Sequence, residues 1–314
     1  MIYLDMRGRL GNQLFQYAYS RYLKEKTGKE ICIKFQTKPQ FGKYGQDGWE
    51  NSLRYFKTQS FKEYKGQVPL WASKTSFLQL LFGVVFFILY RFTVDSSKIN
   101  ESSYKQLKWC SVLNKLGLFW LYNGYYHFNN YKRENIFLKG NFESPLYFNS
   151  IRAILLEEFT PVHDPLTQNR GLYDEINNTN SVCVSIRSFS EIQSNVTVSN
   201  LYNVCTRTYF DEAIKQASEK ISNPHFIIFS DNIEWAKNNL PIIGFKVTYE
   251  TEGNPVWEKL RLMYSCKHFI LSNSTFSWWA QYLSRNDNKI VIAPKRWFND
   301  DYLSPLIDST WITI

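Results

Sequence analysis

The chain has 314 residues, of which 44% are hydrophobic and 18% aromatic, so it is long enough for two hydrophobic cores and its composition excludes wholesale disorder. Its formal net charge of +9 favours an anionic ligand such as a sugar nucleotide, an acidic membrane surface or a nucleic acid as partner. We expect no nucleic-acid partner, since the sequence has no zinc-finger or RNA-binding motif and no long run of lysine and arginine.

The cysteines indicate a reducing environment. There are 5 of them, widely spaced and without the Cys-x-x-Cys pairs of a metal site, and their odd number does not suit a disulfide framework. The N-terminal residues Met1–Asp5 do not read as a signal peptide, because Asp5 and Arg7 interrupt an apolar stretch that is already too short. We therefore expect a cytoplasmic protein.

The first residues read as strand, Gly-rich turn, helix and strand, at Ile2–Met6, Arg7–Gln13, Leu14–Lys26 and Ile31–Phe35. This order is typical of the opening of a doubly wound α/β domain. Gly8 and Gly11 in the turn allow a close approach of the backbone to a ligand. The alternative is a tight strand-to-helix turn with no ligand.

Phe77–Tyr90 is the most apolar stretch of the chain and is flanked by basic residues such as Arg91 and Lys98. It is shorter than the roughly 20 residues that span a bilayer. Three readings stay open for it: a buried helix, a helix on a membrane surface and a true span. Residues 37–70 read as irregular, and Leu107–Tyr126 reads as a further helix.

The second half of the chain alternates between strands and helices. Strands are predicted at 182–187, 225–230, 245–249, 267–271 and 289–293, and helices near 208–220 and at 232–240, 256–265 and 274–284. This alternation predicts a Rossmann-like domain. We expect a domain at 1–165, with a helical insert at about 70–126, and a second domain at 166–314, from which Leu303–Ile314 is a candidate to cross back.

Polar residues follow three of these strands, namely Arg187, Asp231 and the stretch Ser272–Thr275. In an open parallel sheet the carboxyl ends of strands line one crevice, where ligands bind. Arg187 offers a planar, doubly donating cation, and Asp231 offers a carboxylate that accepts from N–H or hydroxyl groups. The alternatives are a surface ion pair for Arg187 and a helix N-cap for Asp231.

A helix is predicted after Ser272–Thr275, because Phe276, Trp279, Ala280 and Leu283 recur at i, i+3, i+4 and i+7. A strand, polar loop and helix in this order present backbone N–H groups and the positive end of the helix dipole to an anion, above all a phosphate. The alternative is an ordinary strand-to-helix connection with a Trp-rich core helix.

Five stretches resemble, in order and spacing, motifs of the bacterial α-1,2-fucosyltransferases, glycosyltransferase family 11. They are Gly8–Ala18, Gly140–Phe148, Phe229–Trp235, Ser272–Trp279 and Ile292–Phe298. The resemblance covers about residues 1–35 and 136–300. It implies a GT-B fold, in which an acceptor-side domain and a GDP-sugar-binding domain, both Rossmann-like, face each other across a cleft.

The resemblance further implies an inverting transfer of L-fucose from GDP-β-L-fucose to the 2-hydroxyl of an acceptor sugar, often galactose, in O-antigen or other polysaccharide assembly. The resemblance implies that the turn at Arg7–Gln13 faces the donor across the cleft. It places Asn12 and Gln13, with Arg9, near the reacting centre; Asn12 is expected to act in catalysis, and Gly11 and Gln13 are expected to bind the donor. An acceptor of this kind could be lipid-linked, and a membrane-surface helix at Phe77–Tyr90 would bring the enzyme to it at the inner face of the membrane.

On the donor side, the residues expected to hold the diphosphate are Arg187, Asn273, Ser274, Thr275 and Phe276. Asp231, assisted by Ser185, is expected to contact guanine or ribose. The chain has no Asp-x-Asp motif with which a metal would clamp a diphosphate, so we expect neither a metal nor another cofactor. Glu143 and Glu191 are candidates for the general base.

One stretch departs from the family pattern. Where the family usually carries His-x-Arg-Arg-Gly-Asp, this chain has Ser185–Ser190, in which only the first arginine, Arg187, is kept. Two alternatives follow from this difference: another GDP-6-deoxyhexose donor such as GDP-colitose, or a relative that binds a GDP-sugar without catalysis.

Overall fold

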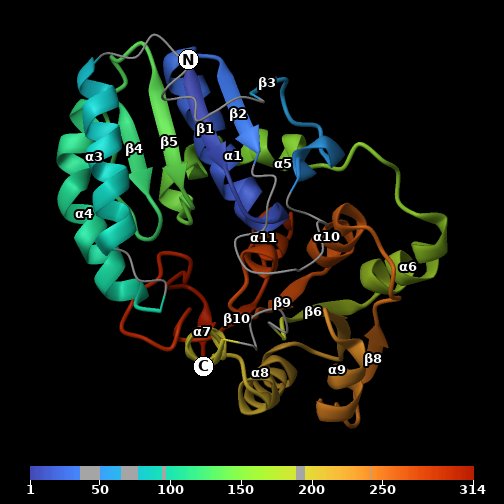
Figure 1. Cartoon of the computed structure of the whole chain (residues 1–314). Helices are drawn as coiled ribbons and strands as arrows, with labels where there is room; N and C mark the ends of the chain where they lie inside the picture. Colours follow the sequence, from blue (N-terminus) through green and yellow to red (C-terminus); the bar gives the residue numbers. More distant parts are fainter. Residues whose placement is uncertain (36–49, 65–76, 94–96, 189–194, 241) are drawn as a thin grey trace. The chain divides into compact units, whose positions relative to one another are not determined.

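The structure, a computed structural model, describes residues 1–35, 50–64, 77–93, 97–188, 195–240 and 242–314 (Figure 1). The chain forms two compact units. The first comprises Met1–Arg54, Thr58–Glu158 and Asp300–Leu306, and the second comprises Tyr55–Lys57, Phe159–Asn299 and Ile307–Ile314. The assignment of acceptor and donor roles to residues 1–165 and 166–314 stays a prediction.

The first unit is built on a parallel sheet with the strand order β3-β2-β1-β5-β4. The strands are β1 (Ile2–Met6), β2 (Ile31–Phe35), β3 (Lys62–Glu63), β4 (Leu118–Leu121) and β5 (Ile136–Gly140). Its described helices are α1 (Leu10–Thr27), α3 (Phe77–Thr93), α4 (Ile99–Lys115) and α5 (Arg152–Glu158), with 3-10 turns at Ser52–Tyr55, Pro145–Tyr147 and Asn149–Ile151. Because every strand pairing is parallel, the carboxyl ends of the strands share one edge.

Helix α1 begins at Leu10, earlier than predicted, and shortens the Gly-rich turn. Gly8 takes a left-handed φ of 78°, and Arg9 is extended at the N-cap. Gln16 fastens the turn from within the helix, since its side chain donates to the Arg7 carbonyl at 2.8 Å and accepts from the Arg7 N–H at 3.0 Å. The first turn of α1 therefore contains Gly11, Asn12 and Gln13.

The predicted helix at Leu107–Tyr126 is wrong in its second half. Helix α4 ends at Lys115, Gly117 adopts a left-handed φ of 72°, and the following residues form β4 beside β5. All of β4 is buried, and its residues Leu118 and Trp120 pack in one apolar cluster with side chains of α3, α4 and β5. A short apolar run of this kind fits a helix or a strand equally well, so periodicity could not separate them.

Helix α3 is attached to its unit by one narrow face, and it runs beside α4 (Figure 1). Gln79, Gly83 and Phe86 are buried, and Gln79 Nε2 donates to the Leu116 carbonyl at 2.6 Å. The reading of Phe77–Tyr90 as a buried helix is wrong, because most of its large apolar side chains are exposed, namely Phe77, Leu78, Leu81, Phe82, Val85, Phe87 and Ile88. Within the described residues, none of the helices combines the length and the hydrophobicity that crossing a bilayer requires.

The second unit contains a parallel sheet with the strand order β11-β10-β9-β6-β7-β8. The strands are β6 (Asn180–Ile186), β7 (Pro224–Ser230), β8 (Lys246–Tyr249), β9 (His268–Ile270), β10 (Val291–Ala293) and β11 (Ile312–Thr313). Its described helices are α6 (Arg170–Asn178), α7 (Val196–Tyr202), α8 (Arg207–Lys220), α9 (Ile233–Asn239), α10 (Val256–Ser265) and α11 (Thr275–Leu283), with a 3-10 turn at Thr167–Asn169. The predicted alternation of strands and helices is confirmed. The sequence pattern did not predict α6, α7 or β11.

The core of the second unit lies between this sheet and its helices, and α8 contributes Phe210 and Ala213 against the strand residues Val184 and Ile228. Asp300–Leu306 groups with the first unit, which confirms the predicted crossing for part of the C-terminal segment. The last residues return to the second sheet as β11, where Ile312 pairs with Ile292.

Candidate active site

Arg187 and Asp231 meet at the carboxyl edge of the second sheet, as predicted. Arg187 directly follows β6, and Asp231 directly follows β7. Their side chains form an ion pair, and Asp231 Oδ1 also accepts from the Ser188 N–H at 2.9 Å. The two side chains are 21% and 24% exposed, so a ligand can still reach the pair.

The N-cap alternative for Asp231 is wrong. Asn232 occupies that position, and its side chain accepts from the Trp235 N–H at 2.9 Å. The carboxylate of Asp231 instead orients the guanidinium of Arg187, which gives this edge of the sheet a fixed cation next to an acceptor for N–H or hydroxyl groups.

Helix α11 begins at the same edge, directly after the loop that follows β9. Ser274 is its N-cap residue but makes no capping bond through its side chain, and Ser274, Thr275 and Phe276 are partly exposed. The dipole of α11 therefore gives this partly exposed entrance a positive end. The loop thus retains the features that the anion prediction requires.

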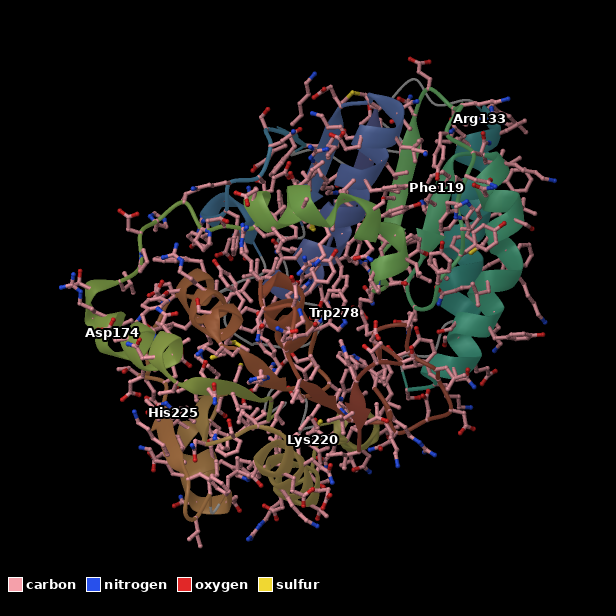
Figure 2. All side chains as sticks on the ribbon, turned by 180° about the vertical axis from the view of Figure 1, so that it is seen from behind. Phe119, Arg133, Asp174, Lys220, His225 and Trp278 are labelled. Atoms are coloured by element: carbon pink, nitrogen blue, oxygen red, sulfur yellow. The ribbon has the colours of Figure 1, made fainter. Side chains whose placement is uncertain are left out.

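The body of α11 is buried on more than the one face that periodicity predicts, since every residue from Ser277 to Leu283 is buried. Trp278, labelled in Figure 2, stacks on Tyr282 with ring centroids 4.9 Å apart, and Trp279 meets Phe159 edge-on at 5.2 Å. These large aromatic contacts anchor the helix and thereby fix the position of its N-terminus.

Ser185 is turned into the interior of the unit. Its hydroxyl lies 2.6 Å from that of Ser277, which in turn lies 3.0 Å from that of Ser272. All three serines are buried. The chain of hydroxyls ties β6 to the entrance of α11, so Ser185 contributes to the site by positioning these elements rather than by offering an exposed group.

Asn273 also has a positioning role. It is buried, and its Nδ2 donates to the carbonyls of Tyr202 and Trp297, both at 2.9 Å. Its Oδ1 and the hydroxyl of Ser188 are buried without a hydrogen-bond partner among the described residues. Orphaned polar atoms of this kind call for a water molecule or a ligand.

Sequence reasoning missed a second charged pair at this edge. Glu250 directly follows β8, is buried, and pairs with Lys259 Nζ at 2.8 Å. Desolvation raises the pKa of Glu250, against the opposing effect of the lysine. Lys259 also donates to the Ser230 carbonyl at 3.3 Å. The position of Glu250 directly after a predicted strand was a signal of the same kind as the one that identified Asp231.

In the first unit, the side chain of Gln13 stabilises the fold through hydrogen bonds to the backbone. Its Nε2 donates to the carbonyls of Gly8 at 3.0 Å and Glu50 at 2.8 Å, and its Oε1 accepts from the Ser52 N–H at 3.0 Å. Gln13 is fully buried, and its amide is occupied by these bonds. Its predicted contact with the donor therefore finds no support in this geometry.

Gly11 is buried, whereas Asn12 is partly exposed in the first turn of α1. Asn12 packs so closely on Gly8 that a Cβ atom at Gly8 would lie 2.7 Å from Asn12 Nδ2. Gly8 is thus required both by its left-handed φ and by the side chain of Asn12.

Of the two candidates for the general base, Glu143 follows β5 at the carboxyl edge of the first sheet, and desolvation raises the pKa of its carboxyl group to about 7. Glu191 lies outside the described residues, as does the neighbouring Ser190. The described residues contain no group of three or more His, Cys, Asp or Glu side chains that could hold a metal ion, and the metal-independent chemistry stays a prediction.

The comparison with solved structures identifies the fold. The chain aligns with a crystal structure of the NodZ alpha-1,6-fucosyltransferase soaked with GDP-fucose, with a TM-score of 0.50, 12% identity, and coverage of 90% of this chain and 92% of that chain. Two α/β units, each with a parallel sheet, together with this likeness show that the chain has a GT-B fold.

The family follows from the sequence comparison: the profile of glycosyl transferase family 11 matches residues 1–314, and the chain belongs to this family. An alpha-1,2-colitosyltransferase of Escherichia coli is 36% identical over 168 residues, which are 52% of this chain and 57% of that protein. The O-antigen biosynthesis glycosyltransferase WbnK of Escherichia coli is 26% identical over the whole length of both chains.

Proposed function

We propose that this enzyme transfers L-fucose, or a related 6-deoxyhexose, from its GDP carrier to the 2-hydroxyl of an acceptor sugar such as galactose, with inversion at the anomeric carbon. The observation that carries the proposal is the Arg187–Asp231 pair at the carboxyl edge of the second sheet, beside the N-terminus of α11. The names of the family 11 relatives, and the GDP-fucose in the NodZ crystal, support the class of donor.

In the proposed reaction the acceptor oxygen bonds to the anomeric carbon while the bond from that carbon to the diphosphate oxygen breaks. Negative charge then builds on the departing diphosphate. Arg187 would take up this charge through its guanidinium, and the backbone N–H groups at the start of α11, around Ser274–Phe276, would share it. Asp231 would hold Arg187 in place, and its remaining lone pairs would accept from guanine or ribose.

The comparison with one relative favours a different donor sugar. The E. coli relative with 36% identity is named an alpha-1,2-colitosyltransferase. Two residues that differ from the family pattern, Ser185 at the end of β6 and Ser188 just after it, give a reason from this chain itself for a different sugar. GDP-colitose is therefore the alternative to GDP-fucose.

The test is GDP release by the purified enzyme in EDTA, measured with several GDP-sugars and a panel of galactose-terminated acceptors. We expect release that depends on the acceptor and persists in EDTA, because Arg187 and α11 replace a metal at the diphosphate. Release from GDP-colitose alone would select the second donor. Loss of activity in EDTA that added Mg²⁺ restores would contradict the metal-free mechanism, and GDP binding without turnover on any acceptor would favour a non-catalytic relative.

We also propose that the exposed face of α3 lies on a membrane surface, where it would bring the enzyme to a lipid-linked acceptor. The neighbouring helix α4 also exposes apolar side chains, namely Tyr104, Trp109 and Val112. Exposed Lys108 and Lys115 of α4 add positive charge, which suits anionic headgroups. We call these side chains, with the seven exposed apolar side chains of α3, the α3–α4 surface.

This surface should bind vesicles rich in phosphatidylglycerol and bind neutral vesicles more weakly. Replacing Leu81 and Val85 by Asp should lower the binding roughly tenfold or more, because each buried apolar side chain contributes on the order of 1.5–3 kcal/mol. Cosedimentation measures the bound fraction. The matched control is Ile243→Asp, an equally drastic change at an exposed apolar residue of the second unit. Binding that the double variant retains in full would contradict this proposal.

A further inference from the structure

We propose that Glu143 is the general base that takes the proton from the acceptor hydroxyl, an inference that rests on the proposed transferase function. Glu143 stands at the carboxyl edge of the first sheet, in the loop directly after β5. It shares this edge with the turn after β1 that carries Gly8 and Arg9, since β1 and β5 are paired neighbours.

The loop that carries Glu143 is held rigidly on both sides. Before it, Phe142 has a left-handed φ of 53°, is 1% exposed, and packs against the rings of Tyr19 and Tyr147 at 4.9 and 5.6 Å. After it, Ser144 is fully buried and caps the next 3-10 turn by accepting from the Leu146 N–H. A strained backbone residue that its surroundings hold in place is common at functional sites, where it fixes a side chain.

The carboxylate of Glu143 has no hydrogen-bond or ion-pair partner among the described residues, although the side chain is only partly exposed. Three other carboxylates of this unit, by contrast, have partners. Asp5 pairs with Lys139, Asp300 accepts from backbone N–H groups, and Glu158 accepts from Tyr17 and Arg21. Glu143 thus keeps its lone pairs for a ligand, which a general base requires.

The surroundings of Glu143 bring its pKa into the range that suits a general base. Loss of solvation raises its pKa to about 7, and no charged side chain in the described part of the chain contributes to this rise. The titratable group that faces it is the phenol of Tyr302, whose own pKa burial raises and whose hydroxyl has a backbone hydrogen bond with Gly124. A base with a pKa near the working pH combines a sufficient ionised fraction with a useful basicity.

The proposed step accounts for the proton, the new bond and the leaving group. The acceptor hydroxyl gives its proton to Glu143 while its oxygen bonds to the anomeric carbon, and the electron pair of the broken sugar–diphosphate bond leaves with GDP. Glu143 afterwards returns the proton to solvent. No further reactant is needed.

The experiment compares wild type with Glu143→Gln, which keeps the shape of the side chain but cannot take a proton. We expect kcat to fall by roughly 10²- to 10⁴-fold with unchanged affinity for the GDP-sugar. The wild-type rate should rise with pH through about 7, and this dependence should be absent from the variant. External formate should restore part of the rate in Glu143→Ala, where it can occupy the vacated space.

Thermal melting and a control variant separate a role in catalysis from a purely structural role. The raised pKa of Glu143 means that the folded state loses stability as pH rises from 4.5 through about 7, so Glu143→Gln should melt higher than wild type at pH 8 and equally at pH 4. The matched control, Asp301→Asn, changes an exposed carboxylate of the same unit and should leave kcat unchanged. Full turnover in Glu143→Gln overturns the inference alone, whereas a wild type without acceptor-dependent GDP release overturns the proposed function and this inference with it.

Discussion

Replacing Arg187 by Ala is expected to lower kcat/KM for the GDP-sugar by roughly 10²- to 10³-fold, the effect of removing one pre-oriented donor from a developing negative charge. Arg187 leaves the end of β6 already held by Asp231, so it needs little reorganisation when the diphosphate departs. The change should cost little stability, about 1 kcal/mol or less, because the pair is partly exposed. Steady-state kinetics and a thermal melt measure the two effects.

Arg187→Lys should recover only part of this loss, since lysine keeps the charge but not the planar fork of donors. Arg207→Ala is the matched control. Arg207 is also in an ion pair with an aspartate, but on the exposed surface of α8, and its removal should leave the kinetics unchanged. If Arg187→Ala turned over GDP-sugar at the wild-type rate, the assignment of the diphosphate to this edge would be wrong.

The second unit was predictable because β6, β7 and β9 are short apolar runs that end in polar residues, with a helical pattern between runs. Arg187 and Asp231 follow such runs directly, and the structure brings them together. The first unit gave no such signal after its second strand, so β3, β4 and β5 were not predicted. There β4 continues the apolar pattern of α4 after a single turn at Gly117, and only the pairing with β5 decides that it is a strand.

The site was harder to predict than the fold, because polar side chains that bind a ligand and polar side chains that satisfy the backbone look alike in a sequence. Gln13 and Asn273 belong to motif stretches, yet their amides bond to carbonyl and N–H groups of neighbouring loops. Ser185 bonds to another serine. Two properties single out Glu143: a carboxylate that has no partner among the described residues, and a raised pKa. Both arise from the packing around it and leave no pattern in the sequence.

Gly140→Ala is expected to have the largest effect on stability. Gly140 ends β5 opposite Leu121 of β4, with a φ of 151° that favours glycine, and a Cβ atom there would lie 1.8 Å from the Leu121 carbonyl oxygen. The two strands would have to separate. Backbone strain and overpacking together should cost roughly 2–6 kcal/mol, a large part of the 5–15 kcal/mol that holds a typical domain together. Urea denaturation measures the loss.

Substitutions at two other glycines separate the contributions of backbone strain and overpacking to this loss of stability. Gly28→Ala meets no atom within 4 Å but has a φ of 67°, so it should cost only the backbone strain, about 1 kcal/mol. Gly171→Ala, on the exposed side of α6 with open space around it, should be neutral or stabilising by about 0.5–1 kcal/mol. If Gly140→Ala were no worse than Gly28→Ala, β4 and β5 would not approach as closely as the structure describes. Because β5 leads directly into Phe142 and Glu143, a Gly140→Ala protein that still folds should also lose turnover, which links the packing of this strand end to the placement of the proposed base.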